Sequence, residues 1–187
     1  NDGSFSSNSA LGVAIGDLNG DGRPDLVVAN DNNGTASIYR NISVASGSLS
    51  FVFVNTVAKK SAYMKQIFLA DLDGDGKLDV VINNMNAPAS IYKNVSATEG
   101  HYLKVKLKGP GTNLQGLGCS VMLYAGGKKE ISTMQTSRGY FSSVEPILHF
   151  GLGGVTTVDS IKVYWDHKSM SVIKNIDADQ LLTIDFA

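Results

Sequence analysis

Two stretches of the chain carry the same order of apolar and polar positions. Residues 12–41 read GVAIGDLNGDGRPDLVVANDNNGTASIYRN and residues 65–94 read KQIFLADLDGDGKLDVVINNMNAPASIYKN. They align with Asp17 on Asp71, at a spacing of 54 residues, with a one-residue deletion before Ser90. Each copy has an apolar run, an acidic glycine-rich loop, a β-branched run, a polar turn and a final S-I-Y-R/K-N segment. This order predicts strand, loop, strand, turn and strand, and its repetition indicates an internal duplication.

A further alternating segment, LSFVFVN at residues 49–55, follows the first copy and predicts a fourth strand. Each copy would then have about the strand content of one propeller blade. No part of the chain shows helical periodicity, so the pattern predicts an all-β protein.

The pattern changes from His101 onward, where the acidic loops stop and alternating segments follow one another. These segments are HYLKVKLKG, CSVMLYAGG, KEISTMQT, DSIKVYWD, SVIKNI and LLTIDF. In the first of them Lys104, Lys106 and Lys108 should share an exposed face, and Gly126-Gly127 predicts a hairpin turn. We expect a small antiparallel sandwich or barrel at 99–187, preceded by the two repeats at 1–98 and a polar linker near 95–100.

Composition narrows the classes of partner. With 43% apolar and 18% charged residues the 187-residue chain is typical of a globular protein. A net charge of −1 gives no global field for nucleic acid, and no apolar stretch approaches the roughly 18 residues that membrane insertion needs. The opening NDGSF predicts a turn and strand whose partner is missing, as expected of a fragment of a longer polypeptide.

The acidic residues gather in the two loops, which hold seven of the seventeen carboxylates. The second loop, residues 71–79, places oxygen-bearing side chains at loop positions 1, 3, 5 and 9: Asp71, Asp73, Asp75 and Asp79. Ca²⁺ takes six to eight oxygen ligands, and glycine at position 6 permits the turn that aims the fifth side chain inward. Lys77, at position 7, would contribute its backbone carbonyl. Mg²⁺ is disfavoured because it keeps several waters in strict octahedral geometry.

The first loop, residues 17–25, offers Asp17, Asn19, Asp21 and Asp25 at the same positions. Its neutral amide leaves three carboxylates against four, so we expect the second site to bind more tightly. Two bound ions would change the net charge from −1 to +3. The alternative is a pair of solvated acidic turns. EF-hands are disfavoured because position 12 is Val28 or Ile82 instead of glutamate, and because strands flank both loops.

The repeats GDLNGDGRPDLVV…SIYRN and ADLDGDGKLDVVI…SIYKN resemble FG-GAP repeats of the VCBS type, the calcium-binding blades of integrin-like β-propellers. The tail resembles the ASPIC and UnbV domain through Gly116-Leu-Gly118, SVMLYAGGKK, residues 138–142 (RGYFS), LHFGLGG, VDSIKVYW and DADQLLTI. The resemblance implies the same loop ligands and adds the Arg23 carbonyl to the first set. Two departures are Asn19 for a commoner aspartate, and Asp166-His167-Lys168 in place of a Pro-Gly-type turn.

Catalytic alternatives find little support in the sequence. The three histidines, His101, His149 and His167, lack a second histidine or cysteine at metal-ligand spacing. There is no G-x-S-x-G elbow, no base lies near Ser137, and no helix pattern follows the glycines of residues 151–154. A glycosidase pair could be drawn only from acids that nothing in the sequence pairs: Asp159, Asp166, Asp177 and Asp179. We therefore predict no catalytic residue.

The single cysteine and two pairs of aromatic residues also allow predictions of burial. Cys119 lies in an apolar run and should be a buried, inert thiol. Two aromatic pairs, Tyr140-Phe141 and Tyr164-Trp165, offer either a stacking platform for a sugar or partner loop, or packing in the sandwich core. We expect Phe141, Tyr164 and Trp165 to pack in the core.

The sequence thus predicts a module that binds two calcium ions, is not an enzyme, and lies outside the cell, on its surface or in the periplasm. We expect a protein or glycan ligand, and self-association through exposed blade edges, since two blades leave edges that need a partner. The alternative is an accessory region of a larger secreted carbohydrate-active or redox enzyme.

Overall fold

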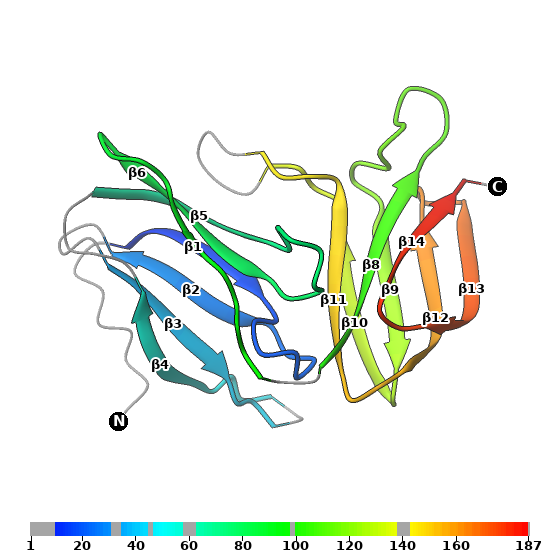
Figure 1. Cartoon of the computed structure of the whole chain (residues 1–187). Helices are drawn as coiled ribbons and strands as arrows, with labels where there is room; N and C mark the ends of the chain where they lie inside the picture. The colour runs from blue at the N-terminus through cyan, green and yellow to red at the C-terminus, as the bar shows by residue number, and fades with distance from the viewer. Residues whose placement is uncertain are drawn as a thin grey trace. The chain divides into compact units, whose positions relative to one another are not determined.

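The computed structural model describes residues 10–30, 35–44, 47–57, 63–97, 100–137 and 143–186, with only the backbone at 10, 11 and 63–65. It divides into two compact units, one formed by Asn1–Asn19 and Arg23–Ala97 and the other by Gly20–Gly22 and Thr98–Ala187. All fourteen regular elements described are strands, so the predicted all-β fold is confirmed (Figure 1). The expectations for residues 1–5 and for Tyr140-Phe141 lie outside the described residues.

The first unit holds two sheets, one from each sequence copy. The four-stranded sheet runs in chain order through β1 (Ala10–Gly16), β2 (Asp25–Asn30), β3 (Thr35–Asn41) and β4 (Phe51–Val57). The three-stranded sheet comprises β5 (Tyr63–Ala70), β6 (Asp79–Met85) and β7 (Ser90–Tyr92). Every pair in both sheets is antiparallel. The fourth strand predicted at 49–55 is β4, displaced by two residues.

The duplication extends to the register of the strands. Gly16 pairs with Asp25 in the first copy and Ala70 pairs with Asp79 in the second. Both hairpins also carry a register shift at the same place, between Ala10 and Gly12 in one and between Met64 and Gln66 in the other. A shared irregularity 54 residues apart is a stronger sign of one repeated structure than the shared apolar pattern alone.

One core joins the two sheets of the first unit. Its fully buried members come from β2, β3, β5 and β6: Val27, Ala29, Ala36, Ile67, Val80 and Ile82. Half-buried side chains such as Leu18, Leu69 and Tyr92 pack against them. Val28 and Ile82, which stand where an EF-hand would need its last ligand, are strand residues of β2 and β6. The two copies therefore bury their apolar faces together.

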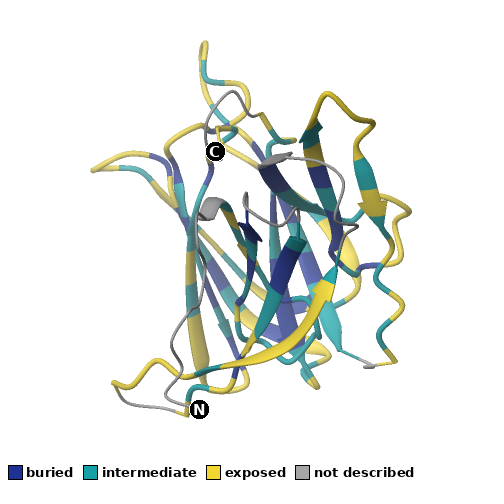
Figure 2. Cartoon of the chain, turned by 90° about the vertical axis from the view of Figure 1, so that its left-hand side faces the viewer, coloured by how far each residue is buried: buried dark blue, intermediate teal, exposed yellow. Residues whose placement is uncertain are grey.

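The second unit is a sandwich of two sheets. One has the order β10-β9-β12-β13, with β9 at Ser120–Ala125, β10 at Lys128–Thr133, β12 at Thr157–Tyr164 and β13 at Met170–Asp177. The other has the order β11-β8-β14, with β8 at His101–Lys108, β11 at Ile147–Gly153 and β14 at Gln180–Asp185. Buried stretches of the strands lie among intermediate and exposed ones in the chain as a whole (Figure 2). On β9 of the second unit every second residue is buried. On β8 the inward residues are Leu103, Val105 and Leu107.

Two details of the sandwich bear on the predictions. Gly126 and Gly127 form the β9–β10 turn with φ of +54° and +75°, as the hairpin signal requires. Strand β14 pairs with β8 in parallel, which differs from the antiparallel arrangement expected throughout. The difference arises because β13 and β14 belong to opposite sheets, so the short connection at Ala178-Asp179 crosses the sandwich instead of forming a hairpin.

Candidate metal centre

The two acidic loops have the same backbone conformation. Gly20 and Gly22 have φ of +69° and +78°, and their counterparts Gly74 and Gly76 have φ of +81° and +84°. Only glycine adopts these left-handed angles without steric cost, which explains the G-D-G in each copy. The repeated glycines thus fold both nine-residue segments into the same turn.

The last carboxylate of each loop closes it by accepting backbone hydrogen bonds. Asp25 Oδ2 accepts from Leu18 N at 3.0 Å, and Asp79 Oδ2 accepts from Leu72 N at 3.1 Å. The other oxygen of each group accepts from the asparagine that ends the S-I-Y-R/K-N segment, Asn41 N or Asn94 N, at 2.8 Å in both cases. Both aspartates are buried, at 1% and 2% exposure. They hold the two ends of the loop to the third strand of each copy.

The remaining carboxylates of the second loop lie together. Asp71, Asp73 and Asp75 each place a carboxylate oxygen within 4.8 Å of the others. Backbone amides of the loop orient all three: Gly74 N and Gly76 N donate to the two oxygens of Asp71 at 2.8 and 3.0 Å, Asp75 N donates to Asp73 Oδ1 at 3.2 Å, and Lys77 N donates to Asp75 Oδ1 at 3.0 Å. Three converging carboxylates with fixed orientations form a compact set of hard oxygen donors.

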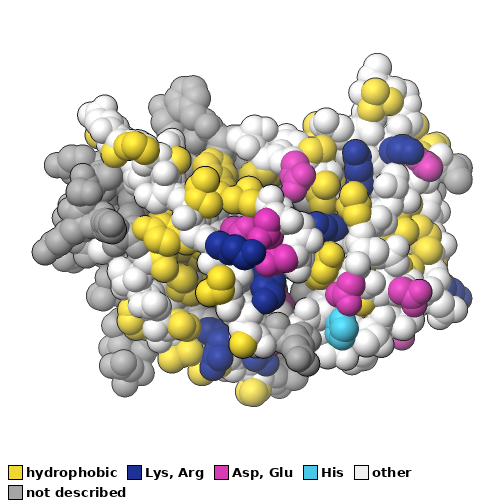
Figure 3. All heavy atoms as spheres, viewed as in Figure 1, with side chains coloured by type: hydrophobic (Ala, Val, Ile, Leu, Met, Phe, Trp, Pro, Cys, Tyr) yellow, Lys and Arg dark blue, Asp and Glu magenta, His cyan; other side chains and the backbone are white. Residues whose placement is uncertain are grey.

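A lysine lies on this cluster. Lys93 Nζ bonds Asp73 Oδ2 and lies 3.6 Å from Asp75 Oδ2. Acidic and basic side chains also meet in the space-filling view (Figure 3). The bonded ammonium lowers the pKa of Asp73, and the carboxylate in turn raises the pKa of Lys93. Lys77 points elsewhere, since its Nζ donates to Ser96 O at 2.6 Å. One tethered cation thus offsets part of the repulsion among the carboxylates.

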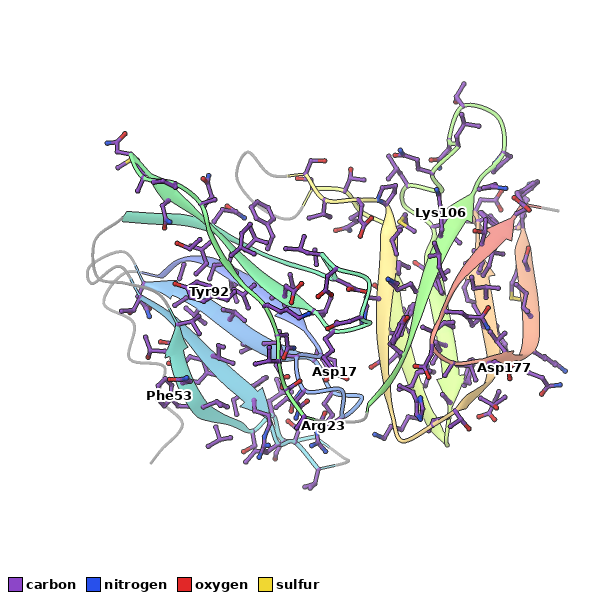
Figure 4. All side chains as sticks on the ribbon, in the orientation of Figure 1. Asp17, Arg23, Phe53, Tyr92, Lys106 and Asp177 are labelled. Carbon is purple, nitrogen blue, oxygen red and sulfur yellow. The ribbon has the colours of Figure 1, made fainter. Side chains whose placement is uncertain are left out.

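The first loop is held differently. Arg23 Nε donates to Asn41 O at 3.0 Å, so the arginine side chain is bound to the end of β3. The predicted ligand of Arg23 is its backbone carbonyl, which this bond does not use. Asp17 is 9% exposed, while Asn19 and Asp21 are half-buried. Figure 4 labels Asp17 and Arg23, which both belong to the connection between β1 and β2. The structure places Asp17, Asn19, Asp21 and Arg23 on the β1–β2 connection and Asp25 at the first position of β2.

Both loops offer only oxygen to a cation, and their side-chain donors are carboxylates with one amide. Carboxylates and carbonyls are the donors of Ca²⁺, whereas soft metals prefer sulfur or imidazole. The residues therefore fit a hard divalent cation. The structure brings three of the predicted ligands of the second loop together and places Asp79, the fourth, at the base of the loop.

The comparison with known families agrees with this geometry. Residues 1–82 match the model described as FG-GAP-like repeat, and residues 109–187 match the model described as ASPIC and UnbV. The chain is an FG-GAP-like repeat region followed by an ASPIC and UnbV domain. The predicted family arrangement is confirmed.

Curated relatives of this FG-GAP-like chain carry one name. The chain is 24% identical to cartilage acidic protein 1 of Homo sapiens over 240 aligned positions, which cover 92% of this chain and 35% of the relative. The protein of the same name from Mus musculus is 24% identical, with 92% and 36% covered. That of Xenopus tropicalis is 31% identical over 105 positions, 52% of this chain and 15% of the relative. The chain spans about a third of the length of the first two.

Other candidate residues of the ASPIC and UnbV domain lie on separate elements. His101 Nδ1 contacts Asp179 Oδ2 at 2.7 Å, at the start of β8, and His149 on β11 stacks on Tyr102. His167 follows Asp166 in the β12–β13 turn. Backbone N–H groups of Lys168 and Ser169 hold Asp166 and lower the pKa of its carboxyl. Asp159 lies on β12 and Asp177 ends β13. These groups serve local turns and pairs in the structure.

Cys119 and Trp165 of the same domain are buried as predicted, whereas Tyr164 is not. Cys119 is buried, its Sγ lies 3.4 Å from Trp165 O, and burial raises the pKa of the thiol, with Asp166 adding to the effect. Trp165 packs in the core and its indole donates to Ser171 Oγ at 2.8 Å. The core prediction for Tyr164 is wrong, because β12 alternates and Tyr164 points to the outer face, 37% exposed. In the described part of the chain no helix is long and apolar enough to span a membrane.

Sequence reasoning missed two residues that contact the acidic loops of the candidate metal centre, Lys93 and Asn94. The signal was available, because S-I-Y-R/K-N recurs in both copies with a cation and an asparagine at its end. The motif by itself predicts only a strand. In the structure the residues that follow this strand contact the acidic loop through Lys93 and Asn94.

Proposed function

We propose that this chain is a non-catalytic calcium-binding module that works outside the cell and presents its surfaces to a protein or glycan ligand. The observation that carries calcium binding is the convergence of Asp71, Asp73 and Asp75 within 4.8 Å on a glycine-shaped loop. The FG-GAP-like match and the two equivalent loop backbones support a second ion in the first loop. The ions would order the loops.

The proposed ligands are the side chains of Asp71, Asp73, Asp75 and Asp79 with the Lys77 carbonyl in the second loop. In the first loop they are Asp17, Asn19, Asp21 and Asp25 with the Arg23 carbonyl. Support for the extracellular setting comes from the FG-GAP-like repeats and from relatives named for cartilage. The two sheets of the first unit share one core, which supports the proposal that they are neighbouring blades of a propeller.

Thermal unfolding tests calcium binding. EDTA-treated protein is compared in excess EDTA and in millimolar free Ca²⁺, together with the double variant Asp71→Ala, Asp75→Ala. An ion that binds only the folded state stabilises it by about 2.7 kcal/mol at a hundred times its Kd. For a chain of this size that raises the midpoint by roughly 5 to 11 °C.

The double variant should show a smaller rise, and Asp17→Ala, Asp21→Ala should remove the contribution of the first loop. The matched control is Asp159→Ala, Asp185→Ala, which removes the same charge from strands of the second unit and should keep the full rise. An unchanged midpoint in Ca²⁺ would show that the loops are solvated acidic turns.

A further inference from the structure

The side chain of Asn94 links the two acidic loops. Its Nδ2 group donates to Leu78 O of the second loop at 3.1 Å and to Leu18 O of the first loop at 2.7 Å. Leu18 and Asn94 are 76 residues apart, yet both belong to the first compact unit. One amide group therefore satisfies a carbonyl from each loop.

The bond continues into both loops. Asn94 N donates to Asp79 Oδ1, the closing carboxylate of the second loop, at 2.8 Å. At the other end, Leu18 N donates to Asp25 Oδ2, the closing carboxylate of the first loop, at 3.0 Å. A continuous path of bonds thus runs from Asp79 through Asn94 and Leu18 to Asp25.

The equivalent residue of the first copy provides an internal comparison. Asn41 makes the same local bonds as Asn94: its N donates to Asp25, its Oδ1 accepts from Ser43 N, and its Nδ2 donates to Pro24 O at 3.0 Å. Asn94 has the matching bonds to Asp79, Ser96 and Leu78. Among the described residues, the bond to a second loop distinguishes Asn94 from Asn41.

Apolar packing fixes the same neighbourhood. A Cβ added to Gly16, just before the first loop, would lie 2.6 Å from Leu78 Cδ1 in the second loop. Strands β1 and β5 belong to different sheets but contact each other, so the two loops emerge from neighbouring strands. Close approach at Gly16 keeps Leu18 O within reach of the Asn94 amide.

We propose that Asn94 is a positioning residue that couples the two calcium sites, so that an ion in one loop raises the affinity of the other. This inference rests on the proposed calcium binding. An ion that orders the second loop fixes Asp79, which holds the backbone N–H of Asn94. The Asn94 side chain then holds Leu18 O, and Leu18 N in turn holds Asp25. The second ion then meets a loop whose ordering entropy is already lost.

Calorimetric titration of the full chain with Ca²⁺ measures the coupling. Asp73→Asn, Asp75→Asn leaves only the first site and Asp17→Asn, Asp21→Asn leaves only the second. The product of the two wild-type association constants should exceed the product of the one-site constants by roughly two- to tenfold, the range expected of one or two neutral hydrogen bonds.

The same set of titrations is repeated with Asn94→Ala, where the ratio should fall toward one. Asn41→Ala is the matched control: it should weaken its own loop and leave the ratio at the wild-type value. If Asn94→Ala does not fold, Asn94→Asp replaces it, because the carboxylate keeps the acceptor for Ser96 N and loses the donor. A ratio that Asn94 variants leave unchanged overturns the proposal.

Hydrogen exchange of the Leu18 amide provides a readout independent of affinity. In Asp17→Asn, Asp21→Asn, Ca²⁺ at the second loop should still slow this exchange several-fold, and adding Asn94→Ala should abolish the effect. If the wild type binds no Ca²⁺, the proposed function and the coupling fail together. If it binds two ions with a ratio of one and unchanged Leu18 exchange, only the coupling fails.

Discussion

At the scale of single residues, position within a repeat says more about role than residue type. Asp79 and Asp71 are both loop aspartates, but Asp79 is buried and fastens two strands, whereas Asp71 belongs to the group of converging carboxylates. Lys93 and Lys77 likewise both border the second loop, and only Lys93 bonds a carboxylate of it. Replacement of the two lysines should therefore affect Ca²⁺ binding differently.

We predict that Lys93→Met raises the Ca²⁺ affinity of the second loop. The tethered ammonium occupies carboxylate oxygens that an ion would use, and exposed ion pairs of this kind are weak enough for the ion to displace. The release of two such pairs should raise the affinity by roughly two- to thirtyfold. Titration calorimetry measures the change.

The control is Lys77→Met, which removes the same charge close to the same carboxylates, although the Nζ of Lys77 donates to Ser96 O instead of a loop aspartate. A purely long-range charge effect would raise the affinity equally in both variants. Equal gains, or a loss in Lys93→Met, would contradict direct competition between the ammonium and the ion.

The thiol of Cys119 should resist alkylation in the folded protein. It is 2% exposed and burial raises its pKa, so both access and thiolate formation are suppressed at neutral pH. Iodoacetamide labelling followed by mass spectrometry should be at least a hundredfold slower in buffer than in 8 M urea, by the general rule that the thiolate is the reactive form. Similar rates in both would contradict the burial.

At the scale of elements, each acidic loop depends on the strand that follows its hairpin. The loop joins β1 to β2 or β5 to β6, and its closing aspartate bonds the residue at or just beyond the end of β3 or β7. The packing of Gly16 against Leu78 adds a contact between the two copies. Strand pairing and loop shape are therefore linked in each copy.

We predict that Gly16→Ala destabilises the first unit by about 1 kcal/mol, the lower end of the usual cost of overpacking, because the colliding atoms are the ends of leucine side chains. Its Cβ would lie 2.6 Å from Leu78 Cδ1 and 3.0 Å from Leu69 Cδ1. Urea unfolding of the single variant, of Leu78→Ala and of both together measures the effect.

Because Leu78→Ala removes the colliding atom, the two changes should be less than additive by at least about 0.5 kcal/mol, the deviation expected of contacting residues. The comparison variant is Gly74→Ala, which meets no neighbour within 4 Å and tests only the cost of its left-handed φ of +81°. Additive free energies of unfolding for Gly16 and Leu78 would contradict the contact.

At the scale of the whole molecule, each compact unit has its own core, and the four-stranded sheet ends in a strand with exposed apolar residues. Strand β4 pairs with β3, and Val52, Phe53 and Val54 are exposed on it, although the ring of Phe53 also packs edge-on against Tyr39. Apolar terminal strands are typical sites of strand addition. This supports self-association or contact with a neighbouring blade at β4.

We predict that Val54→Lys reduces self-association, because a charge on a terminal strand opposes edge-to-edge pairing. Sedimentation velocity over a hundredfold range of concentration measures the shift toward monomer. Val95→Lys is the control, since Val95 is more exposed, at 80% against 55%, and lies outside the strands. A wild-type protein that stays monomeric, or equal effects of both variants, would contradict a role for β4.

Sequence alone determined the features that depend on local chemistry. The 54-residue repeat, the alternating strands, the Gly126-Gly127 turn and the acidic loops all follow from residue order, because periodicity and left-handed glycines act over a few neighbouring residues. The burial of Cys119 and Trp165 followed from apolar strand patterns. The exposure of Tyr164 did not follow from the sequence. Alternate residues of a sandwich strand point outward, and an apolar residue at the end of the strand can lie on either face.

Only the tertiary structure decided which distant groups meet. The parallel pairing of β14 with β8, the ammonium of Lys93 on Asp73, and the Asn94 amide on Leu18 O join segments separated by 20 to 77 residues. No local periodicity encodes such contacts, because they depend on how sheets pack and which strand ends reach a loop. The sequence specifies the loops and their donor atoms, and the packing of the two copies brings a carbonyl of each loop within hydrogen-bond distance of the Asn94 amide.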